Sequence, residues 1–374
     1  MKKLLAIVSV LGLLATGSPT AGAGPSAGGF SSDNIEWLTT VRFETGTATG
    51  AEVIGKYLYV TSWKSFSIYD VSDPLNPQLL SITPFGFKFE NEDVSTNGKI
   101  LIFSESTPQS ILHVWDVEDK ENPEEIATLP GAGQHTMSCL FKCQYLYGSG
   151  GAVIDLRDPA KPKVIGNWGK GMPATSGHDV NEVSPGIVLT SSRPIMVLDA
   201  RKDPAHPKLL AVGDDDRVTG GVHSNKWPQG GKDRFALVGS ESNFTGRCSG
   251  ANGAFMTWDA RNWQERRSLT LIDIYQLENG TYQDGKPAVN ASGCSAHWFE
   301  EHPSFHNGGL VALGSYDHGM RLIDVSTAGK ISEVGFFEPM PTAMTSAAYW
   351  LTDRIIYSVD YERGIDVLKY TGKI

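Results

Sequence analysis

The sequence predicts an all-β fold, a seven-bladed β-propeller, from three observations. An apolar run ending in aspartate recurs seven times, at Asp70, Asp116, Asp155, Asp199, Asp259, Asp324 and Asp366. Neighbouring aspartates in this series are 39 to 65 residues apart, and propeller blades commonly repeat every ~40 to 50 residues. No stretch of the chain shows a sustained helical period of apolar residues.

The clearest repeat spans residues 177–213 and contains four short strands. It reads HDVNEV, a Ser-Pro-Gly turn, IVLTSS, PIMVLDA, the loop KDPAHP and finally KLLAVG. A turn signal follows each of the first three runs, which is typical of an antiparallel meander of four strands, the blade of a propeller. The loop after the third strand is preset, because Asp closes a turn through its own side chain and proline excludes the helical region for the residue before it.

The two ends of the repeat array complement each other. Residues 33–44 form one surplus strand before the first repeat, whereas only eight residues follow Asp366. We therefore expect the N-terminal strand to pair with the last blade and close the ring, which removes exposed sheet edges. The expected organisation is a signal peptide over residues 1–23, a flexible leader over 24–32, and one propeller domain over 33–374.

The N-terminus predicts export. Lys2 and Lys3 precede an apolar run over residues 4–15, and Ala-Gly-Ala at 21–23 offers a small-residue cleavage site. We expect a secreted or cell-envelope protein with no transmembrane segment in the mature chain. In such a compartment four cysteines favour two disulfides, Cys139–Cys143 and Cys248–Cys294, although three connectivities are open.

The charge of the chain argues against nucleic acid as a partner. The formal net charge is −10 at pH 7, whereas binding to phosphates requires a basic face. The sequence also contains no P-loop, dinucleotide-binding fingerprint or nucleophile elbow.

The repeated apolar run ending in Asp and followed by DPxxP resembles the LVIVD-repeat family of secreted bacterial β-propeller proteins. The similarity extends over the mature chain and is strongest in the first, third and fourth repeats. The resemblance implies the propeller fold, so a function must be argued from individual sites.

One constellation of side chains points to chemistry. His135, His178, His223 and His297 occupy equivalent positions where first strands open, and Glu92 takes that position in another repeat. First strands are innermost in a propeller, so these five side chains are expected to converge at one end of the central channel. Imidazole nitrogens with a carboxylate suit a first-row transition metal, and the pattern predicts a possible copper or zinc site.

A structural role for these histidines is the alternative. His178 after Gly177, with an apolar-Asp pair about twenty residues later, is similar to the GH…WD pattern of WD-repeat blades, where the histidine is hydrogen-bonded within its own blade. Repeated buried polar side chains often only satisfy hydrogen bonds.

Two functions remain open from the sequence. The first is an extracellular binding module, expected to be monomeric, whose long insertions at 243–252 and 278–293 would contact a protein or glycan. The second is a metal-dependent, copper-type oxidoreductase, because the chain is similar in architecture, though not in motifs, to selenium-binding and methanethiol oxidase propellers. No catalytic residue is assigned by the sequence.

Overall fold

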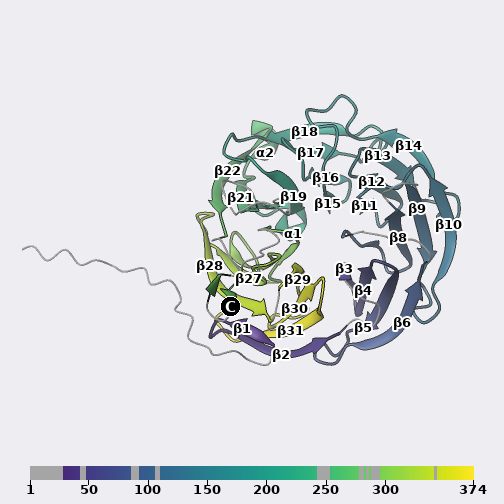
Figure 1. Cartoon of the computed structure of the whole chain (residues 1–374). Helices are drawn as coiled ribbons and strands as arrows, with labels where there is room; N and C mark the ends of the chain where they lie inside the picture. Colours follow the sequence, from purple (N-terminus) through teal and green to yellow (C-terminus); the bar gives the residue numbers. More distant parts are fainter. Residues whose placement is uncertain are drawn as a thin grey trace, which may run out of the picture.

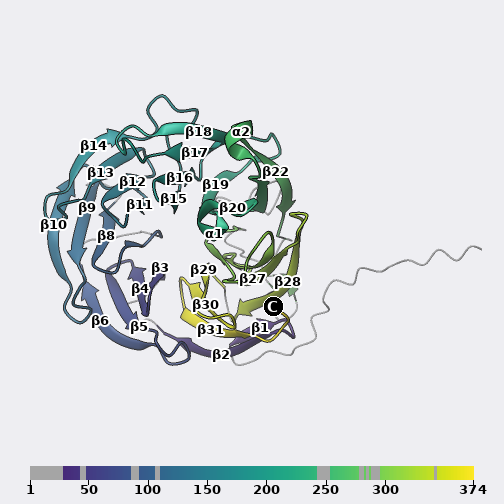
Figure 2. The same cartoon turned by 180° about the vertical axis from the view of Figure 1, so that it is seen from behind.

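A computed structural model describes residues 28–42, 48–85, 92–105, 110–241, 253–277, 282–283, 286–287, 295–340 and 343–374. These residues form a ring of β-sheets around a central axis (Figure 1, and from behind in Figure 2). The helical content of the described residues is two single turns, α1 (Pro228–Gly231) and α2 (Trp263–Arg266). None of the described helices is long and apolar enough to cross a membrane.

The first three blades are separate four-stranded antiparallel sheets. Blade 1 contains β3 (Ala48–Ile54), β4 (Tyr57–Ser62), β5 (Ser65–Asp70) and β6 (Gln78–Pro84). Blade 2 contains β7 (Ser95–Thr96), β8 (Ile100–Glu105), β9 (Ile111–Asp116) and β10 (Glu124–Pro130). Blade 3 contains β11 (Met137–Leu140), β12 (Tyr145–Gly148), β13 (Ala152–Asp155) and β14 (Lys163–Asn167).

The next two blades share one eight-stranded sheet. Blade 4 contains β15 (Val180–Ser184), β16 (Ile187–Thr190), β17 (Ile195–Asp199) and β18 (Lys208–Gly213). Blade 5 contains β19 (Gly221–Lys226), β20 (Phe235–Glu241), β21 (Phe255–Asp259) and β22 (Ser268–Tyr275). A short parallel contact between β18 and β22 joins the two meanders.

The last two blades are completed by N-terminal strands. Blade 6 contains β25 (Phe299–Glu301), β26 (Gly309–Gly314), β27 (Met320–Val325) and β28 (Ile331–Pro339), with β1 (Gly29–Ser31) added outside β28. Blade 7 contains β29 (Thr345–Trp350), β30 (Ile355–Asp360), β31 (Gly364–Tyr370) and β2 (Ile35–Val41). A separate two-stranded hairpin pairs β23 (Tyr282–Gln283) with β24 (Lys286–Pro287).

The strand pairing confirms the all-β propeller and its closure. The parallel contact between β18 and β22 divides the eight-stranded sheet into two four-stranded antiparallel meanders. The surplus N-terminal strand pairs antiparallel with β31, as predicted. The leader prediction over 24–32 was wrong in part, because Gly29–Ser31 pairs with β28 and covers an edge that would otherwise be exposed.

The first strands lie nearest the axis and the fourth strands lie outermost (Figure 1). The blades pack through apolar side chains of their sheet faces. Between blades 1 and 2, for example, Tyr59, Phe66, Leu101 and Phe103 form one fully buried cluster.

The hairpin between β11 and β12 carries one of the two expected disulfides. Cys139 and Cys143 lie at disulfide distance, with Cα atoms 4.4 Å apart. Phe141, Lys142 and Cys143 all have positive φ angles, so the loop turns tightly enough to bring the two cysteines together. Cys248, Cys294, the signal peptide, insertion 243–252 and nearly all of insertion 278–293 lie outside the described residues.

Candidate metal centre

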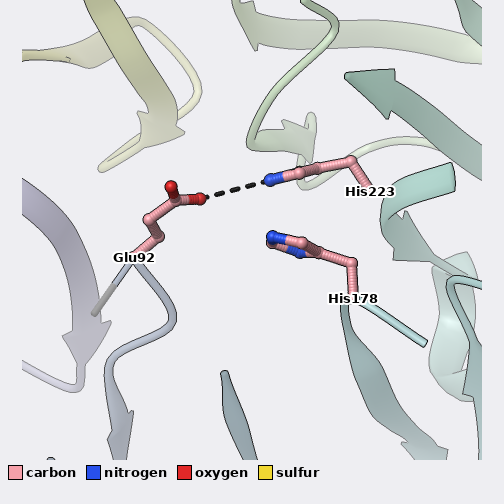
Figure 3. Close-up of side chains that lie close together, drawn as sticks. All are labelled: Glu92, His178 and His223. Atoms are coloured by element: carbon pink, nitrogen blue, oxygen red, sulfur yellow. Dashed lines mark hydrogen bonds and ion pairs between the residues drawn. The ribbon is translucent and has the colours of Figure 1, made fainter. Parts of the chain in front are cut away.

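The structure brings the five predicted side chains together at one end of the axis. Glu92 reaches in from one side, and His178 and His223 reach in from the opposite side (Figure 3). His223 and His297 are fully buried, Glu92 is buried, and His135 and His178 are half-buried. The sequence repeat therefore identified side chains that the fold places next to one another.

Four of the five residues stand just before a first strand rather than within it. Glu92, His135, His178 and His297 precede β7, β11, β15 and β25 by two or three residues, whereas His223 lies inside β19. The ladder of β19 is irregular between Val222 and Asn225. A bulge at this place redirects side chains, and it aims His223 at the axis.

Hydroxyl groups next to the histidines connect neighbouring blades. Thr136, directly after His135, donates to the backbone carbonyl of His178, and Ser224, directly after His223, donates to the carbonyl of His297. Blades 3 and 5 thereby fix the backbone that carries the imidazole of the following blade.

The imidazole rings form a row. The centroids of His135 and His178 are 4.8 Å apart, those of His178 and His223 are 3.7 Å apart, and those of His223 and His297 are 4.1 Å apart. The Nε2 atoms of His135 and His178 are 3.0 Å apart. Two ligands on one ion at ~2.0–2.1 Å are separated by about 2.9 Å at a right angle, so this spacing suits a shared metal.

One carboxylate oxygen faces two imidazoles. Oε2 of Glu92 lies 3.2 Å from Nε2 of His223 and 2.9 Å from Nε2 of His297. Nδ1 of His297 donates to the carbonyl of Ser346 at 2.8 Å, because a carbonyl can only accept. In the neutral ring Nε2 then presents a lone pair to the carboxylate, so a proton or a cation is required between the two atoms.

The charges of the site follow from burial and from these contacts. Burial alone would raise the pKa of Glu92, but the charge of His297 and the hydrogen bond with His223 hold it well below its usual range. Burial lowers the pKa of His178 strongly and that of His223 as well. Burial would also lower the pKa of His297, yet the charge of Glu92 raises it. A neutral imidazole is the form that binds a metal, and His178 and His223 are kept neutral.

The donor set fits a transition metal ion. Glu92, His178 and His223 offer ligand atoms within 4.8 Å of one another. Nδ1 of His178 and Nδ1 of His223 have no hydrogen-bond partner among the described residues, so no second contact fixes which nitrogen of either ring faces an ion. Two imidazoles and a carboxylate are ligands of iron, copper and zinc sites.

Sequence reasoning missed two residues of this site. Glu241 completes a second group with His223 and His297, again with ligand atoms within 4.8 Å of one another. Tyr316 is fully buried, donates its hydroxyl proton to Oε1 of Glu241 at 2.7 Å, and lies with its ring centroid 4.4 Å from that of His297. Glu241 is the last residue of β20 and pairs with Gly221, the first residue of β19. An acidic residue at the end of a second strand is therefore the sequence feature that indicates this ligand.

Asp179, the residue after His178, has its carboxylate contacts away from the imidazole row. Its carboxylate accepts hydrogen bonds from Asn181 at 2.6 Å and from the Asn225 backbone at 3.3 Å. Burial raises the pKa of Asp179 to about 7. Side chains alternate along an extended segment, so the residue after His178 faces away from the imidazole row.

A cavity of about 140 Å³ adjoins Glu92 along the axis. Its lining includes Glu52, Asp93, Lys226, Trp298 and Tyr349. Burial would lower the pKa of the Lys226 ammonium, but the charges of Glu52 and nearby acidic residues raise it above its ordinary value. The cavity gives a small polar molecule room beside the carboxylate.

The contacts disagree with the WD-repeat alternative for these histidines. His135 contacts His178 of the next blade, His223 contacts Glu92 across the axis, and His297 donates to Ser346 of the following blade. A histidine that served its own blade would instead hydrogen-bond within that sheet.

A profile of the LVIVD repeat matches residues 45–83, which cover blade 1. The chain carries an LVIVD repeat. The match confirms the resemblance that the Asp-DPxxP pattern suggested. No curated protein sequence matches the chain.

Solved structures similar to this chain include natural and designed proteins. The WD40 β-propeller domain of Doa1 aligns with a TM-score of 0.59 and 11% identity, over 90% of this chain and 97% of that one. YCF48 bound to D1 peptide aligns with a TM-score of 0.54 and 9% identity, over 91% and 96%. The computationally designed Ika8 protein aligns with a TM-score of 0.51 and 11% identity, over 89% and 99%. At these identities the similarity establishes the propeller fold only.

Proposed function

We propose that this protein binds a first-row transition metal ion in its axial channel. With that ion it would act as a metal-dependent oxidoreductase of the copper type. The observation that carries the proposal is the approach of Glu92 Oε2 to Nε2 of both His223 and His297. A metal ion between these atoms would remove the electrostatic repulsion between the carboxylate oxygen of Glu92 and the lone pair on Nε2 of His297. Such an ion would supply redox or Lewis-acid chemistry, and the adjoining cavity gives a small substrate access to Glu92.

Metal content tests the proposal directly. The intact protein, folded in an oxidising compartment, is offered Cu²⁺, Zn²⁺ or Fe²⁺ separately, and the bound metal is measured by elemental analysis. Replacing both His178 and His223 by Ala should abolish binding while the far-ultraviolet circular dichroism stays unchanged. His206→Asn is the matched control, because His206 is exposed on an outer loop and pairs with Asp203.

Two outcomes would contradict the proposal. One is less than about 0.1 equivalent of every metal in the wild-type protein, since a built site binds stoichiometrically. The other is a double variant that unfolds although the wild type never binds metal, which would make the histidines structural.

The second candidate is an extracellular interaction module. The observation in its favour is the propeller fold, which YCF48 shares in a structure with a bound D1 peptide. The module would recognise a protein or glycan through the blade 5 insertions, and its monomeric state is part of this proposal. Recovery of the same partner by wild type and by a deletion of residues 243–252 would contradict this role for the insertion.

Export is proposed for both candidates. It is supported by the signal-like N-terminus and by the disulfide-bonded pair Cys139 and Cys143, since disulfides persist in oxidising compartments. Fractionation of cells producing the full chain, with detection in the medium or envelope, tests the location.

A further inference from the structure

Six donor side chains surround the axis, which is more than one tetrahedral ion takes. They are Glu92, His135, His178, His223, Glu241 and His297. They divide into two overlapping groups, one around Glu92, His178 and His223, the other around His223, Glu241 and His297.

The row of rings spreads these donors along a line. The planes of His178 and His223 are inclined by 32°, and those of His223 and His297 by 33°. Two rings that each stack closely and nearly parallel on a third must lie on its opposite faces. His178 and His297 are therefore separated by the full thickness of the His223 ring, and they belong to different metal positions.

We infer that the channel is built for two metal ions side by side; this inference rests on the proposed metal-binding function. The first position is formed by His135, His178 and Glu92. The second is formed by His223, Glu241 and His297. The Glu92 carboxylate is grouped with His178 of the first position, and its Oε2 faces His223 and His297 of the second, so it is the donor that two ions ~3.5–4 Å apart would share.

His135 and Glu241 are the residues on which the two-ion arrangement depends. His223 belongs to both groups, and one nitrogen cannot bind two ions. Both positions are filled only if His135, whose Nε2 is 3.0 Å from that of His178, replaces His223 in the first. Glu241 is equally necessary for the second metal position. The Tyr316 hydroxyl donates a hydrogen bond to Oε1 of Glu241, which leaves Oε2 to face the ion.

The six donors divide evenly between the two positions. Each position contains one carboxylate, Glu92 or Glu241, and two imidazoles. Such a set of nitrogen and oxygen donors is one that first-row transition metals accept.

The stoichiometry of bound metal tests the inference. The intact protein is saturated with Cu²⁺ or with Zn²⁺ alone, and bound ions are counted by native mass spectrometry and elemental analysis. We expect two equivalents in the wild type and in His206→Asn, and one equivalent in His135→Asn and in Glu241→Gln. With Cu²⁺, the electron paramagnetic resonance of the wild type should show two interacting ions, and that of each single variant an isolated one.

The outcomes separate this inference from the proposed function. One equivalent in the wild type that persists in His135→Asn and in Glu241→Gln overturns the two-ion arrangement and leaves the metal-binding proposal standing. No bound metal in the wild type overturns both. Because the decisive count is made on the wild type, a variant that fails to fold cannot rescue the inference.

Discussion

Glu92 controls the charge of the axial site because it is a single carboxylate facing two imidazoles. The ion pair with His297 and the hydrogen bond with His223 keep it ionised despite its burial. The same carboxylate raises the pKa of His297. A metal ion that enters between these atoms replaces the proton on His297 and retains the attraction of the carboxylate, so protons and metal compete for one place.

Tyr316 is expected to strengthen metal binding through Glu241. Tyr316→Phe removes the hydroxyl that holds Oε1 of Glu241, and loss of such outer partners weakens metal affinity by about 10- to 100-fold. Chelator competition with Zn²⁺ measures the affinity. Tyr357→Phe is the matched control, because Tyr357 donates to the carbonyl of Pro74 away from the axis at the same 2.7 Å. Equal Zn²⁺ affinities of Tyr316→Phe and the wild type would show that the Tyr316 hydrogen bond does not contribute to metal binding by Glu241.

Asp179 is expected to make the stability of the metal-free protein depend on pH. Its pKa is raised by burial to about 7 in the folded state, and a raised carboxyl pKa gives stability that is lost as the pH rises through that value. Asp179→Asn does not titrate, so relative to the wild type it should gain about 2 kcal/mol between pH 5 and pH 8. Denaturant unfolding at both pH values measures the difference; a constant difference would contradict the assigned protonation.

The repeat in the sequence located Glu92 and the four histidines because each stands within or just before the first strand of its blade. Glu241 and Tyr316 could not be found in that way. Glu241 lies at the end of a second strand, and Tyr316 lies in the turn before a third strand with a positive φ of 47°. Their positions depend on how neighbouring blades meet, which a repeat pattern within one chain does not specify.

The element that the sequence specified most fully is the end of the third strand. Oδ1 of Asp70, Asp116, Asp155, Asp199 and Asp259 accepts a hydrogen bond from the backbone N–H two residues later. In blades 3, 4 and 5 an arginine at that later residue also pairs with the same carboxylate. The turn expected from Asp therefore forms in every blade from 1 to 5.

Asp199 and Asp324 make a matched pair for testing this element. The side-chain hydrogen bond of Arg201 lowers the pKa of Asp199 to about 2. Burial raises the pKa of Asp324, at the equivalent place in β27. Asp199→Ala should cost about 1 kcal/mol of unfolding free energy through the lost turn, and Asp324→Ala should cost less. Equal losses in urea unfolding would contradict a stabilising role for the Asp turn.

At the scale of the whole molecule, closure depends on an N-terminal strand held by more than backbone pairing. Trp37 Nε1 and Thr40 Oγ1 of β2 donate to Oδ1 of Asp366 in β31, at 3.1 and 2.5 Å. Asp366 is fully buried and also pairs with Arg363 at 2.8 Å. The strand count at the two ends predicted the pairing of β2 with β31. The Asp366 contacts and the extra strand β1 depend on side-chain and edge geometry that the strand count does not contain.

Removing the closing strand should destabilise the entire ring. A chain that begins at residue 43 loses β1 and β2, exposes the edge of β31, and removes the hydrogen bonds that Trp37 and Thr40 donate to Asp366. We expect a melting temperature lower by at least about 10 °C, or aggregation. A chain that begins at Gly28 is the control, because it keeps both strands and should melt like the longer protein. Scanning calorimetry and light scattering measure both effects; equal melting of the two chains would show that the ring is stable without its N-terminal closure.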